Sequence, residues 1–115
     1  MNSVTLTGYL GNAPELGGAD GTTYARFSLA VTTRYKKDDG ERAERTDWFR
    51  IVAFDGVAKS IADLGKGDLV GVVGRLRSNT WEKDGVSRTT VEVVAQSVEF
   101  LRLKAWAAGG ETAAA

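Results

Sequence analysis

An apolar segment near the middle of the chain, residues 46–54, carries three aromatic side chains and one cation. Successive side chains of a β-strand point to opposite faces, so residues two apart share a face. The two faces would be Phe49, Ile51 and Ala53 on one side, and Trp48, Arg50, Val52 and Phe54 on the other. Rings that flank a guanidinium suit a surface on which nucleic-acid bases stack. Alternatively, both faces are buried, one in the core and one beneath a partner subunit or helix. The segment alone fits both interpretations equally.

Further basic side chains lie close in sequence to aromatic ones. The set comprises Arg34, Lys36, Lys37, Arg75, Arg77 and Lys83, and the last three surround Trp81. Cations hold phosphates, while rings accept bases of any identity. For a single basic residue, a solvated ion pair is the simpler interpretation, because carboxylates such as Asp38, Glu44 and Glu82 lie nearby. The combined pattern favours binding of a single strand.

Tyr35 is the fourth aromatic candidate. Strict alternation places it on the core side with Phe27, Leu29 and Val31. Thr33 already interrupts that apolar run, so we expect a bulge or twist to turn Tyr35 outward.

The elements that must position these residues are mainly strands. Alternation predicts strands at residues 2–10, 23–36, 46–54, 68–81 and 87–95, the last extended past a bend by residues 98–103. Asp39-Gly40 and Asp84-Gly85 predict hairpin turns. Val57, Ile61 and Leu64 form the stripe of a short helix, which Gly65 would end. Residues 11–21 are expected to be a loop.

Three strands, a short helix and two strands are the element order of an all-β OB-fold. This fold is a five-stranded, partly open barrel, and here the helix falls between the third and fourth predicted strands. Its second and third strands and the neighbouring loops bind oligonucleotides or oligosaccharides. SH3-like barrels and sandwich fragments share part of this pattern. An OB-fold that binds oligosaccharide or protein therefore remains an alternative, and it predicts no salt-dependent affinity for oligonucleotides.

Composition excludes several classes of function. The 115 residues suffice for one domain, and without Cys or His the chain lacks disulfides, imidazole catalysis and the usual zinc ligands. The carboxylates are scattered and no nucleophile or phosphate-loop motif is present, so we expect no metal, no cofactor and no enzyme activity. Fifteen basic and fifteen acidic residues cancel, which argues mildly against nucleic-acid binding unless the basic ones cluster. The absence of a signal peptide and of a membrane span predicts a cytoplasmic protein.

Together, several segments resemble the bacterial single-stranded DNA-binding protein family, over about residues 2–100. They are VTLTGYLGNAPE (4–15), FSLAV (27–31), TDWFRIVAF (46–54), KGD (66–68), VVGRL (72–76) and TW (80–81). The resemblance implies an OB-fold that binds single-stranded DNA without sequence preference in replication, recombination or repair. It implies base stacking at Tyr35, Trp48, Phe54 and Trp81, although the family commonly has Trp at the position of Tyr35.

Strand edges and an apolar outer surface favour self-association, with strand 2–10 as the first candidate contact and Phe49 as a second. The resemblance implies a homo-oligomer that is a tetramer rather than a dimer. We expect an OB domain at residues 1–104 and a flexible tail at 105–115. The tail lacks the acidic tip with which family members recruit replication and repair enzymes, so no such recruitment is expected. Either the sequence is truncated or it is a short phage, plasmid or accessory form. The alternative within this fold is a primosome-type adaptor that binds DNA weakly and proteins mainly.

Overall fold

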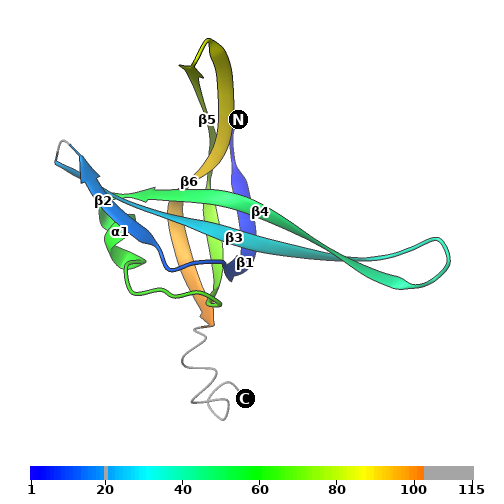
Figure 1. Ribbon diagram of the computed structural model, residues 1–115. Helices are drawn as coiled ribbons and strands as arrows, with labels where there is room; N and C mark the ends of the chain where they lie inside the picture. Colours follow the sequence, from blue (N-terminus) through cyan, green and yellow to red (C-terminus); the bar gives the residue numbers. More distant parts are fainter. Residues whose placement is uncertain (20, 103–115) are drawn as a thin grey trace.

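Six strands and one short helix build the computed structural model, which describes residues 1–19 and 21–102 (Figure 1). The elements are β1 Val4–Leu10, β2 Glu15–Ala19, β3 Thr22–Lys36, β4 Arg42–Phe54, α1 Asp55–Ser60, β5 Leu69–Lys83 and β6 Val86–Arg102. The expected tail, residues 105–115, and the end of the last predicted strand at Leu103 lie outside the described residues.

The strands form one closed barrel. Its sheet order is β1-β5-β6-β4-β3, with β2 added at the outer edge of β3, and β1 also pairs with β3. Two short seams complete the wall: β1 meets β3 at two residue pairs, and β4 runs parallel to β6 over two more. The helix α1 falls between β4 and β5, the third and fourth of the predicted strands. The OB-fold prediction is therefore confirmed.

Gly8 allows the first seam to close. A Cβ at this position would lie 2.2 Å from the carbonyl oxygen of Ala30, so only a residue without a side chain lets β1 approach β3 this closely. Just beyond the seam, the amide of Gly11 donates to the carbonyl of Ser28 at 2.8 Å. The amide of Ser28 in turn donates to Oδ1 of Asn12 at 2.9 Å. These bonds tie the end of β1 to the middle of β3.

Apolar side chains from every barrel strand and from the helix region fill the interior. The buried cluster comprises Leu10, Ala25, Phe27, Leu29, Ile51, Ala53, Ala58, Ile61, Leu64, Val70, Val72, Val93 and Ala95. The inward positions predicted for Phe27, Leu29, Ile51 and Ala53 agree with this cluster. Val52 was predicted to face outward with Trp48, and that prediction is wrong. It is fully buried because it lies where three strands meet, between Arg26 on β3 and Val94 on β6.

Two other local predictions need correction. Residues 15–19 were expected to be loop, but they form β2, which pairs with β3 from Glu15 to Ala19. The helix was expected at residues 57–64 and ended by Gly65, but α1 ends at Ser60. Ile61 and Leu64 remain buried in the turn that follows, and the amide of Gly65 donates to Oδ2 of Asp68 at 2.8 Å.

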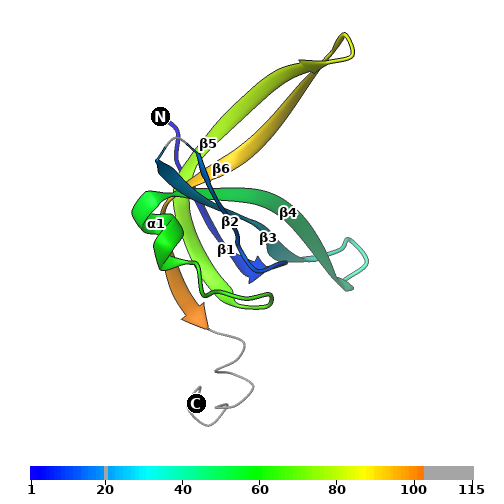
Figure 2. The same cartoon turned by 60° about the vertical axis from the view of Figure 1, so that its left-hand side comes forward.

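Two long hairpins project from the barrel in different directions (Figures 1 and 2). We call residues 32–46 the β3–β4 arm and residues 77–92 the β5–β6 arm. Both predicted Asp-Gly turns lie at their tips. Gly40 and Gly85 have φ of +88° and +76°, and Asp84 has φ of +54°, as the tight turns of twisted hairpins require. The predicted bend before Val98 is also present. It is a register shift at which Gln96 has no partner on β5, since Gly74 pairs with Ala95 and Val73 with Ser97.

Candidate nucleic-acid interface

Arg50 lies between two surface hollows, each of which contains a tryptophan. One hollow, of about 390 Å³, is lined by Arg26, Arg50, Trp81 and neighbouring polar residues. The other, of about 540 Å³, is lined by Trp48, Arg50 and the apolar side chains of Leu76 and Val91. Both hollows form where the β5–β6 arm rises beside β4. The structure thus brings together Trp48, Arg50 and Trp81, which come from two different hairpins.

Trp48 is an exposed ring, with 62% of its surface accessible. Across the sheet it faces Ala30, whose side chain is too small to cover it. Its ring lies against Gly11, where a Cβ would come within 2.4 Å of the indole. Small neighbours on both sides therefore leave the indole accessible. Of the two interpretations of segment 46–54, the exposed face holds at Trp48 and Arg50, whereas burial on both faces holds at Val52.

Phe54 is half-buried, and a cation lies over its ring. The guanidinium carbon of Arg77 is 5.4 Å from the ring centroid, within the range of a cation–π contact. The arrangement differs from the one that alternation suggested, because Arg77 from β5, rather than Arg50 from the same strand, covers the ring.

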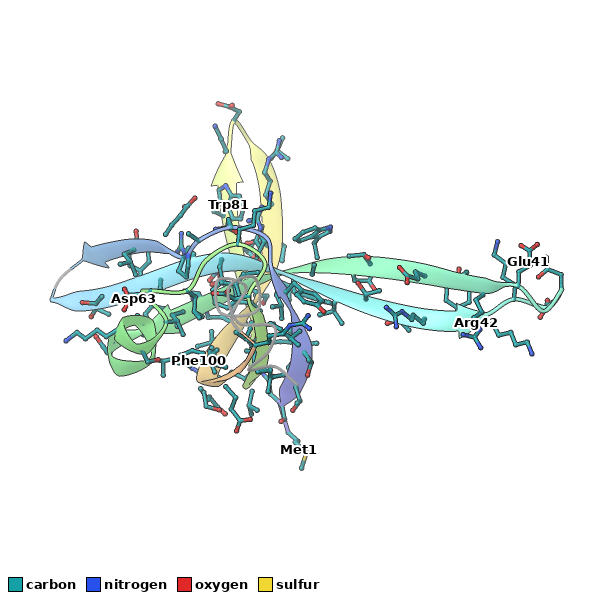
Figure 3. The ribbon with its side chains drawn as sticks, turned by 90° about the horizontal axis from the view of Figure 1, so that it is seen from below. Met1, Glu41, Arg42, Asp63, Trp81 and Phe100 are labelled. Carbon is teal, nitrogen blue, oxygen red and sulfur yellow. The ribbon has the colours of Figure 1, made fainter. Side chains whose placement is uncertain are left out.

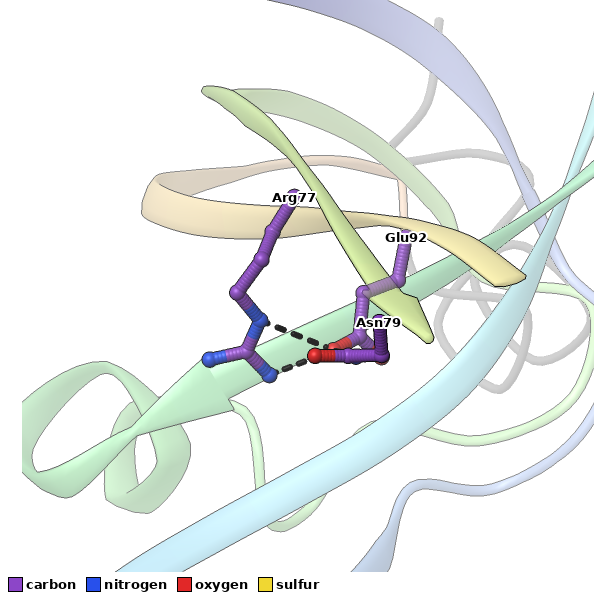
Figure 4. A network of polar contacts seen from close by, with 3 residues as sticks. All are labelled: Arg77, Asn79 and Glu92. Atoms are coloured by element: carbon purple, nitrogen blue, oxygen red, sulfur yellow. Dashed lines mark hydrogen bonds and ion pairs between the residues drawn. The ribbon is translucent and has the colours of Figure 1, made fainter. Parts of the chain in front are cut away.

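Arg77 itself is held by a carboxylate opposite it on β6 (Figure 4). Its guanidinium forms an ion pair with Glu92, and Nε donates to Oε1 of Glu92 at 3.1 Å. Nδ2 of Asn79 donates to the same oxygen at 2.9 Å. Burial by itself would raise the pKa of Glu92, but the hydrogen bonds from Arg77 and Asn79 and the charges of Arg77 and Arg26 outweigh it and lower that pKa.

The β3–β4 arm carries Tyr35 with a group of cations. Tyr35 is 49% exposed, and the register from Tyr24 to Lys36 runs without a shift, so no bulge turns it outward. It is exposed because the arm extends beyond the barrel and nothing covers either face; among residues 32–46 only Ala43 is partly covered. Lys36 lies directly opposite Arg42, near the tip that Figure 3 labels at Arg42 and Glu41. Lys37 follows in the turn and is exposed.

The remaining predicted cations differ in their partners. Arg34 pairs with Glu44 at 3.1 Å, but both side chains are well exposed, so the pair contributes little and leaves Arg34 available. Arg75 is exposed on β5 opposite Val94, outside the two hollows. Lys83 lies with Trp81 and Arg88 near the tip of the β5–β6 arm. Trp81 is labelled in Figure 3 and is 44% exposed.

Arg26 and Arg42 were absent from the predicted set. Arg26 lines the same hollow as Arg50 and Trp81, and its guanidinium lies 5.0 Å from the ring centroid of Tyr24. Alternation along β3 already places Arg26 outward, but only the strand register shows that it lies near Arg50. Arg42 could have been found from the hairpin, because a turn centred at residues 38–40 sets it opposite Lys36.

Within residues 1–19 and 21–102, acidic side chains nowhere gather in threes as a metal ion would need. None of the helices in this part of the chain is long and apolar enough to cross a membrane.

The closed barrel, the helix between β4 and β5 and the two projecting hairpins define an OB-fold protein with an aromatic and basic outer surface. The model of the single-strand binding protein family matches residues 1–101. The chain therefore belongs to the single-strand binding protein family.

Relatives agree with this assignment. The chain is 38% identical over 108 residues to single-stranded DNA-binding protein 1 of Xylella fastidiosa, covering 90% of this chain and 79% of that one. It is 41% identical over 105 residues to single-stranded DNA-binding protein 3 of Clostridium acetobutylicum, covering 88% and 71%. The Plasmodium falciparum family member, solved in complex with single-stranded DNA, superposes with a TM-score of 0.80 at 28% identity, covering 88% of this chain and 95% of that one. None of these matches favours the primosome-type adaptor.

Proposed function

We propose that this protein binds single-stranded DNA without sequence preference and protects it during replication, recombination or repair. The observation that carries the proposal is the position of Arg50 between two hollows that each hold an accessible tryptophan. A strand that crosses Arg50 would stack bases on Trp48 and Trp81 and place a phosphate on the guanidinium between them. Stacking uses ring faces, which every base has, so sequence is not read.

The proposed interface extends along both arms. Stacking residues are Tyr35, Trp48, Phe54 and Trp81, and the basic members are Arg34, Lys36, Lys37, Arg50, Arg75, Arg77 and Lys83, to which we add Arg26 and Arg42. All of these cations except Arg77, which is paired with Glu92, would hold phosphates. The chain has no net charge, and carboxylates such as Glu44, Glu82 and Glu92 lie among these cations, so the proposal rests on individual cations beside accessible rings and not on a net positive surface. Residues 1–104 act as the binding domain, and the protein binds its ligand without chemical turnover, in the bacterial cytoplasm.

We further propose that the protein works as a homo-oligomer, a tetramer. Apolar side chains that the barrel leaves exposed, among them Tyr9 on β1 and Phe100 and Leu101 on β6, would be covered by other copies. One DNA strand would then wrap several barrels and gain affinity through their linkage.

A fluorescence titration tests the binding function. Oligo-dT should quench tryptophan emission on stacking, with an affinity that falls steeply as salt rises, because bound cations replace counterions on the strand. A duplex of the same length should bind far more weakly, since its bases are already stacked. Equal affinity for duplex and single strand, or an affinity independent of salt, would rule the proposal out.

A further inference from the structure

The ion pair of Arg77 and Glu92 is more deeply buried than the other ion pairs of the described residues. The side chains of Arg34 and Glu44 are 81% and 60% exposed, and those of Arg45 and Asp47 are 73% and 38% exposed. Arg77 and Glu92 are 37% and 11% exposed. Water screens the first two pairs, whereas Glu92 depends on its partners within the protein.

The three hydrogen bonds of this network all end on one oxygen atom. Oε1 of Glu92 accepts from Nε and Nη2 of Arg77 and from Nδ2 of Asn79. Arg77 and Glu92 are also direct cross-strand partners, so the backbone register holds the two side chains opposite each other before they interact. The register therefore places the two side chains within reach of each other.

The same guanidinium reaches a third strand. Its carbon lies over the ring of Phe54 on β4, while its nitrogens bind Glu92 on β6. Arg77 therefore links the base of the β5–β6 arm to the end of β4, beside the wall of the hollow that contains Trp81. A phosphate that captured Arg77 would have to leave Glu92, an almost buried carboxylate, without its counter-ion, which is strongly unfavourable.

We propose that Arg77 is a positioning residue that fixes the β5–β6 arm and the Phe54 ring, and that Glu92 keeps its charge from neutralising a DNA phosphate. This inference rests on the proposed binding of single-stranded DNA. It separates Arg77 from Arg50, which is exposed, forms none of the ion pairs found among the described residues, and is the phosphate contact at the same site.

The test compares how oligo-dT affinity depends on salt in matched variants. Each phosphate neutralised on a single strand contributes about 0.7 to the slope of log affinity against log salt. Arg50→Met is the control and should reduce the magnitude of the slope by about 0.7. Glu92→Gln keeps the shape and an acceptor oxygen but removes the charge, so it frees Arg77 and should increase the slope by about 0.7.

The double variant Arg77→Met/Glu92→Gln removes a neutral pair. It should leave the slope at the wild-type value while lowering affinity several-fold at every salt concentration, because the arm and Phe54 lose their anchor. A double variant whose slope falls by about 0.7 would show that Arg77 contacts phosphate, and a Glu92→Gln variant with the wild-type slope would show that Glu92 does not hold the charge of Arg77 back; either result would overturn the inference. Should the double variant fail to fold, Glu92→Gln alone decides between these outcomes.

The two proposals fail in different ways. Wild-type protein without salt-dependent binding would overturn the proposed function and this inference together. A salt-dependent wild type that responds to Arg50→Met but not to Glu92→Gln would overturn the inference alone.

Discussion

Trp48 is accessible because its neighbours are small. Ala30 lies opposite it, and Gly11 lies against the edge of its ring. The indole makes little contribution to the core, since 62% of its surface is exposed. At the scale of single residues, binding and stability should therefore separate at this position.

Trp48→Ala should weaken oligo-dT binding by about 1–3 kcal/mol, the usual loss of one stacked base. The unfolding temperature should remain near that of the wild type. Leu16→Ala is the matched control, because Leu16 is also an exposed apolar side chain on a strand, at 56%. A large drop in thermal stability with unchanged intrinsic affinity would instead make Trp48 structural.

Glu92 should give the folding equilibrium a pH dependence. Its pKa is lower in the folded protein than in an unfolded chain, so its interactions stabilise the fold above the ordinary glutamate pKa of about 4.3. That contribution is lost as the pH falls through the lower, folded pKa. Urea unfolding at pH 7 and at about pH 3 should show a smaller loss on acidification for Glu92→Gln than for the wild type. The same loss in both proteins would contradict this expectation.

At the scale of elements, the barrel depends on one close approach. Gly8→Ala would push a Cβ against the backbone carbonyl of Ala30, which cannot move aside without opening the seam between β1 and β3. We expect destabilisation of about 1–3 kcal/mol, as for other overpacked sites. The control is Gly71→Ala, also in a barrel strand, where the nearest atom is 3.9 Å away. Equal unfolding free energies for the two variants would show that the seam is dispensable.

The barrel strands were readable from the sequence because local patterns determine them. Alternation identified β1, β3 and β5, the Asp-Gly pairs identified both turns, and alternation placed Trp48 and Arg50 outward. The errors come from contacts distant in sequence. β2 was missed because Gly17 and Gly18 resemble loop, although the glycine at 17 leaves room for the ring of Tyr24. Burial of Val52 follows from the parallel seam between β4 and β6, which no local pattern encodes. The pairing of Arg77 with Glu92 was missed although the turn at Asp84-Gly85 fixes the register of that hairpin.

At the scale of the whole molecule, the exposed apolar surface predicts self-association. Light scattering at micromolar concentration should give about four times the chain mass of 12.3 kDa. Phe100→Glu places a charge on one of the most exposed apolar positions of β6, at 51%, and should shift the mass toward a smaller species. Thr22→Glu, at an exposed polar position at the start of β3 and outside the candidate contacts, is the comparison. A monomer mass for the wild type would reject the tetramer, and a stable dimer would favour the primosome-type adaptor function instead.

The pairing of β1 with β5 has a consequence for synthesis on the ribosome. Of the residue pairs between β1 and β5, Tyr9 and Leu69 are separated by the shortest stretch of chain, and Val4 and Gly74 by the longest. At about 5–20 residues per second, β1 waits roughly 3–12 s after it is made before the first of these partners exists. Throughout that interval the nascent chain presents an unpaired strand edge. The order in which the strands are translated, and not the final fold, therefore sets the period in which this protein is most exposed to wrong pairing.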